Sequence, residues 1–159
     1  MRIFSDTTGR QWQINMTIGS VKQVKALTGY DLLELDKGDR PLLATLRTDI
    51  MAVCDVIFAL VKKQAEEAGI SDEQFAEALG GNAIVVAQDA FWDELEDFCQ
   101  SLNRQHLAKA IQAMGKTVNL AYQKISQQVD QLDIEQMLND QFTKISGELP
   151  ESSELTPAD

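Results

Sequence analysis

The spacing of apolar residues changes at Thr17, and this change constrains the fold more than any other feature of the chain. Before Thr17, residues 2–5 and 11–16 alternate polar and apolar side chains around the Gly-containing loop 6–10, which is the pattern of a β-hairpin. After it, apolar residues recur at three- and four-residue steps, as on amphipathic helices. Since a lone hairpin is only marginally stable, it must pack on those helices. The sequence therefore predicts a mainly α fold, a helical domain with a small N-terminal β-hairpin.

Capping residues place the ends of the first helices. Thr17 can cap a helix over about residues 18–28, and Gly29 suits the left-handed position that ends it. After one further apolar turn over residues 30–35, Pro41 can open another short helix.

The most apolar stretch of the chain is predicted to be a buried helix. Asp49 and Gly69 enclose a helix over about residues 50–68, and its apolar run from Ile50 to Val61 has Asp55 as its only polar member. A bilayer needs about 20 apolar residues, which is longer than this run. We therefore expect a core helix and no membrane span here.

Two more helices follow. Residues 71–74 match the capping-box pattern, so a short helix should run from there to about Leu79. The break at residues 80–82 then precedes a strongly amphipathic helix. Its apolar positions are Ile84, Ala87, Phe91, Leu95, Phe98 and Leu102.

The last long pattern predicts a C-terminal amphipathic helical arm. Asn103 can cap it, and a separate helix or a bend of the same helix can follow near Asp133. We expect a body of hairpin and helices over residues 1–101, the arm over 102–146 and a disordered acidic tail over 147–159. The apolar stripe of the arm consists of Leu107, Ile111, Met114, Val118, Ile125 and Leu132.

Charge and the N-terminal sequence limit the functional classes. With 25 acidic and 14 basic residues the net charge is -11, so we expect no nucleic acid as a partner. One His and two Cys cannot form a four-ligand zinc site by themselves. The first 18 residues lack the apolar stretch of a secretory signal, and we therefore expect a cytoplasmic protein.

An acidic stripe is a candidate partner-binding site. Asp89, Asp93 and Asp97 follow one another at four-residue steps, with Glu94 and Glu96 beside them. Like charges at this spacing destabilise a helix by a few tenths of a kcal/mol per pair. A cationic partner would remove that cost, and a plain solvent-exposed helix face is the alternative.

No residue pattern in the chain indicates catalysis. Asp55 is the strongest candidate for an acid or base, although its helical position groups it with polar residues. His106 has no Ser, Cys or carboxylate at a spacing typical of a triad, and Gly80 and Gly81 lack the Lys of a phosphate loop. We therefore predict a protein that is not an enzyme and has no cofactor and no metal site.

The stripe of the arm leaves two structures open. The arm can fold back, in which case the stripe is part of the core, or it can project and pair with another helix. In the second case the stripe, together with Asp89, Asp93 and Asp97, would bind a partner, and the chain could also form a homo-oligomer.

The order of these elements resembles a known family. The segments 21–35, 49–61 and 69–75, followed by an acidic helix, are similar to tail assembly chaperones of long-tailed bacteriophages and prophage-like elements. The resemblance covers about residues 1–101. It implies a small, mostly helical protein in the host cytoplasm that binds a tape-measure-like helical protein and helps tail tube protein assemble around it. Two alternatives are an acidic decoy that mimics nucleic acid and a small enzyme that uses Asp55.

Overall fold

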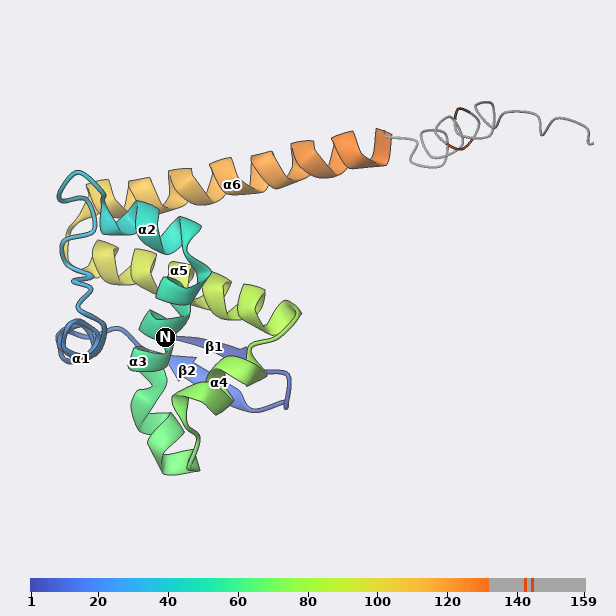
Figure 1. Cartoon of the computed structure of the whole chain (residues 1–159). Coiled ribbons are helices and arrows are strands. Elements are labelled where there is room, and N and C mark those ends of the chain that lie inside the picture. Colours follow the sequence, from blue (N-terminus) through green and yellow to red (C-terminus); the bar gives the residue numbers. More distant parts are fainter. Residues whose placement is uncertain (132–141, 143, 145–159) are drawn as a thin grey trace, which may run out of the picture. The chain divides into compact units, whose positions relative to one another are not determined.

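The computed structural model describes residues 1–131, 142 and 144 (Figure 1). It confirms the predicted class, because the chain is mainly helical with a small N-terminal two-stranded hairpin. The chain divides into two units, residues 1–115 and residues 116–159. The elements are β1 (Arg2–Ser5), β2 (Gln11–Ile14), α1 (Ile18–Thr28), α2 (Leu42–Thr48), α3 (Ile50–Ala68), α4 (Asp72–Ala78), α5 (Asn82–Ser101) and α6 (Gln105–Gln131).

The hairpin is antiparallel, with Phe4 opposite Trp12 and both side chains buried. Its loop is organised by the buried carboxylate of Asp6. One oxygen of Asp6 accepts from the backbone N–H of Thr8 at 2.9 Å and of Arg10 at 3.0 Å, and the other accepts from Trp12 Nε1 at 2.8 Å. The loop therefore fixes the orientation of the tryptophan that the hairpin buries.

The caps predicted for α1, α3 and α4 are present. The Thr17 hydroxyl accepts from the N–H of Ser20, and Asp49 accepts from the N–H groups of the first turn of α3. Ser71 and its partner three residues later form the reciprocal capping box at the start of α4. Gly29 and Gly69 adopt the left-handed conformation, with φ of 78° and 67°.

The hairpin packs on two long helices and one short one. α5 lies against β1, and α3 lies against β2 (Figure 1). α4 contributes Phe75, whose ring stands edge-on to Trp12 with the centroids 5.0 Å apart. The ring of Phe58 on α3 lies 5.3 Å from that of Phe75. These aromatic contacts join the sheet and the helices in one core.

The predicted start of the arm is wrong in one detail. Asn103 does not cap α6, because it lies in the left-handed region with φ of 58° and the helix begins at Gln105. The backbone carbonyl of Arg104 instead accepts from the N–H groups of Leu107 and Ala108. Asn103 therefore belongs to the turn that connects α5 to α6.

The boundary between body and arm also differs from the expected 101/102. The structure divides the chain after Gly115, so the first turns of α6 belong to the same unit as the hairpin and α1 to α5. The expected second helix or bend near Asp133 and the expected acidic tail over 147–159 lie outside the described residues.

Candidate functional site

The first part of the predicted arm stripe is core. Leu107 and Ile111 expose only 1% and 2% of their surfaces, and Met114 is partly buried and packs against the same core. This corrects the expectation that these three residues form a surface open to a partner. For this part of α6 the fold-back alternative holds, because its apolar side chains complete the core of residues 1–115.

Arg47, on α2, holds this part of α6 in place. Its guanidinium carbon lies 3.7 Å from the centroid of the Trp92 ring of α5, and Nη2 donates to the carbonyl of Ile111 at 3.2 Å. Burial lowers the pKa of Arg47 below its ordinary value, and the negative charge of Asp89 opposes that shift. Arg47 thus joins three helices through a stacking contact, a hydrogen bond and a charge interaction.

The stripe residue Ile125 is exposed, together with its apolar neighbours on the same side of α6. Tyr122 and Ile125 of α6 expose 69% and 57% of their surfaces, and Ala121 beside them is also exposed. We call Ala121, Tyr122 and Ile125 the distal face. Leu120 is 57% exposed as well, but at 100° per residue it lies on the opposite side of the helix.

The two remaining stripe residues add nothing to this geometry. The side chain of Val118 is not described, and Leu132 lies outside the described residues.

The acidic stripe is exposed but only partly free. Asp89, Asp93 and Asp97 all face solvent. Asp97 forms an ion pair with Arg2 at 2.7 Å, and Asp89 interacts with the charge of Arg47. Among the residues that the structure describes, neither Asp89 nor Asp93 forms an ion pair, and Asp93 has no arginine acting on it as Arg47 acts on Asp89. The repulsion expected along α5 is therefore reduced by two arginines from within the same unit.

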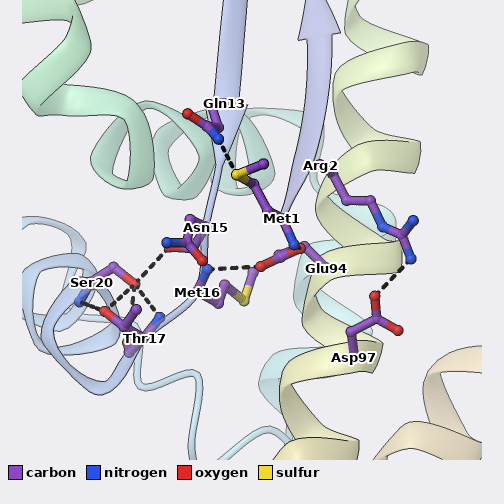
Figure 2. Close-up of polar contacts among 9 residues, drawn as sticks. All are labelled: Met1, Arg2, Gln13, Asn15, Met16, Thr17, Ser20, Glu94 and Asp97. Carbon is purple, nitrogen blue, oxygen red and sulfur yellow. Dashed lines mark hydrogen bonds and ion pairs between the residues drawn. The ribbon is translucent and has the colours of Figure 1, made fainter.

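The sequence placed Glu94 beside the acidic stripe, but the structure does not. Glu94 is 96% buried beside the hairpin. Figure 2 shows its carboxylate between the two ends of that hairpin: Oε1 accepts from the N–H of Met16 at 3.0 Å, and Oε2 forms an ion pair with the α-amino group of Met1. Glu94 and the nearby Arg2–Asp97 pair thus tie the hairpin to α5.

Sequence reasoning missed both Glu94 and Arg47. Glu94 carried a usable signal, since it lies three residues after Phe91 and four before Phe98 and so occupies an apolar position of the amphipathic pattern. Arg47 carried none, because its position next to Leu46 on a short helix does not predict an aromatic partner 45 residues later.

Asp55 is exposed, as its helical position predicts, and it lines a hollow of about 380 Å³. Burial and the nearby charges of Asp72 and Asp49 raise its pKa above the ordinary value. The same surroundings, burial first, raise the pKa of the Cys54 thiol to about 11, so that thiol stays protonated at neutral pH. No hydrogen bond joins Asp55 to a second titratable group in the described residues. The hollow is lined by Leu27, Thr28, Asp55, Phe58, Ala59, Lys62 and Asp72.

His106 lies at the surface, with its Nε2 3.5 Å from a carboxylate oxygen of Asp36. Within the described residues, no group of three or more His, Cys, Asp and Glu side chains is arranged to hold a metal ion. None of the helices described there combines the length and apolar character that crossing a bilayer requires.

No protein-family model, curated protein or solved structure matches the chain. Among the described side chains of α6, the distal face is the exposed apolar feature that continues the buried side of the helix.

Proposed function

We propose that the protein is a non-enzymatic assembly chaperone that binds apolar helical segments of a client protein through the distal face. The observation that carries the proposal is the change of environment along one side of α6. Ile111 and Ile125 are fourteen residues apart, about four helical turns, and so lie on the same side. Ile111 is buried by its own chain, whereas Ile125 is exposed to solvent.

The chemistry of the distal face suits a helical client. Burying a side chain of the size of Ile125 contributes about 1.5–3 kcal/mol, whereas association costs several kcal/mol before any net affinity remains. Ala121, Tyr122 and Ile125 therefore need a partner that covers all of them at once. An amphipathic helix lying along α6 does this with residues at three- and four-residue steps.

The charge distribution favours a soluble complex. Residues 49–101 hold 12 acids and 2 bases, whereas residues 116–129 hold Lys116 and Lys124 and no acid. The acidic part keeps the protein and its bound client in solution, and the binding segment does not repel an acidic client. Of the acidic stripe, Asp93 is the residue best able to add a contact with a basic partner, because Asp89 and Asp97 already interact with arginines.

The client we propose is a tape-measure-like helical protein, with tail tube protein as a further partner, in the host cytoplasm. This part of the proposal rests on the resemblance of residues 1–101 to tail assembly chaperones. Such a client exposes a long helical surface before it is enclosed by tube subunits, so a protein with a free apolar helix face can keep it soluble.

Co-expression tests the proposal. The candidate client, a large helical protein chosen from the adjacent genes and called the neighbour below, is produced alone, with the wild-type chain, with Ile125→Lys and with Leu120→Lys. The two replaced residues are equally exposed on the same helix, so Leu120→Lys is a matched control for an added charge away from the distal face.

We expect the wild-type chain and Leu120→Lys to raise the soluble fraction of the neighbour, and Ile125→Lys to fail. If the neighbour is no more soluble with the wild-type chain than alone, or if both variants act like the wild type, the distal face does not have this function.

A further inference from the structure

The distal face has the features of a surface that pairs with its own copy. It continues the side of α6 whose earlier residues, Leu107 and Ile111, already pack against helices of the body. A helix with one apolar side buries that side most simply against a second helix, and exposed apolar surface promotes association. In a solution without client, another copy of this chain is the partner that is always present.

The charges next to the distal face permit this pairing. Between residues 117 and 128 the only charged residue is Lys124. Charged residues beside an apolar seam normally decide which helices pair, by attraction or repulsion across the seam. Because this segment carries a single charge in twelve residues, two copies of it repel each other very little.

The charge of the remaining chain sets the direction of pairing. Residues 1–115 carry 17 acidic and 11 basic residues and precede the distal face in the sequence. A parallel pair would bring two acidic bodies to the same end of the two helices. An antiparallel pair separates them to opposite ends and gives a closed twofold dimer.

We propose that two copies pair through their distal faces, antiparallel and centred near Tyr122, and that this dimer covers the binding face until a client displaces one copy. The inference rests on the proposed function, since it describes how that site is regulated. Residues 116–131 form only about 24 Å of helix, so the contact between two copies is short and we expect a pair weak enough for a client to displace.

Sedimentation velocity over a range of protein concentrations tests the pairing. We expect the wild-type chain to shift from monomer to dimer with rising concentration. Ile125→Lys should raise the dissociation constant at least about tenfold, because each dimer then buries two added charges. Leu120→Lys should leave it unchanged. A wild-type chain that stays monomeric at all concentrations, or equal behaviour of the two variants, overturns the proposal.

Cross-linking tests the direction. In a chain with Cys54→Ala and Cys99→Ala, a cysteine introduced as Tyr122→Cys should form an intermolecular disulfide. One introduced as Gln128→Cys should not, because the antiparallel arrangement holds the two copies of residue 128 about 18 Å apart along the helix axes. Efficient disulfide formation through Gln128→Cys overturns the antiparallel arrangement.

The two proposals fail separately. A chain that dimerises through Ile125 but does not raise the solubility of its neighbour contradicts the chaperone function and keeps the dimer. A chain that stays monomeric and still raises that solubility, in a manner sensitive to Ile125→Lys, contradicts the dimer and keeps the function.

Discussion

Two isoleucines of α6 should respond very differently to the same substitution. Ile111→Ala should lower the free energy of unfolding by about 2–4 kcal/mol, because it removes a core side chain that is 2% exposed and leaves a cavity beside the Arg47 contact. Ile125→Ala should change it by less than about 0.5 kcal/mol, because Ile125 is 57% exposed and no core surrounds it. Both residues lie on the same side of one helix, so the difference in helix propensity between Ile and Ala is the same for the two substitutions and cancels in the comparison.

Urea denaturation followed by tryptophan fluorescence measures both values. Trp12 and Trp92 are buried in the unit that contains Ile111, so their emission reports on the unfolding of that unit. The measurements belong at low micromolar concentration, where the proposed dimer does not contribute to stability. If Ile111→Ala stays within about 0.5 kcal/mol of the wild type, or if Ile125→Ala is equally destabilising, the division of α6 into a core part and an exposed part is wrong.

Three other contacts give further predictions. Arg47→Lys should cost about 1–2 kcal/mol in the same urea assay, because Lys cannot stack on Trp92 while donating to the α6 backbone, and unchanged stability would contradict the contact. Glu94→Ala should cost about 1–3 kcal/mol, because the buried N–H of Met16 loses its acceptor, with Asp93→Ala as a near-neutral control. For Asp6, burial raises the pKa, but hydrogen bonds from Thr8, Trp12 and the loop backbone outweigh it and lower the folded-state pKa. Ionised Asp6 therefore stabilises the fold above about pH 4, and this contribution is lost as the pH falls through the lower folded-state pKa. Asp6→Asn should then be more destabilising at pH 7 than at pH 3, whereas an equal effect at both would contradict the shift.

Local signals predicted most of the secondary structure. The hairpin, the helix that Thr17 caps and the helix between Asp49 and Gly69 were all predictable, because each depends on neighbours within a few residues. A capping hydroxyl or a left-handed glycine acts on its own turn, so its effect does not depend on the rest of the fold.

Contacts distant in sequence were not predictable. The apolar period of α6 is the same before and after Gly115, so the period alone does not show that Ile111 is buried while Ile125 is exposed. Asn103 was misassigned because a residue that can cap a helix can equally adopt a left-handed turn. The partners of Arg47 and Glu94 depend on how α2, α5 and the hairpin meet, which no local pattern records.

Hydrogen exchange of α6, measured with and without the co-expressed helical neighbour at a low micromolar concentration where the proposed dimer is dissociated, tests client binding by the distal face most directly. We predict that the client slows exchange of the backbone amides of residues 116–129 and leaves those of residues 105–115 almost unchanged, because the latter are already protected by the core. Unchanged exchange over residues 116–129 in a complex that forms, or new protection confined to the helix that carries Asp89, Asp93 and Asp97, would contradict it.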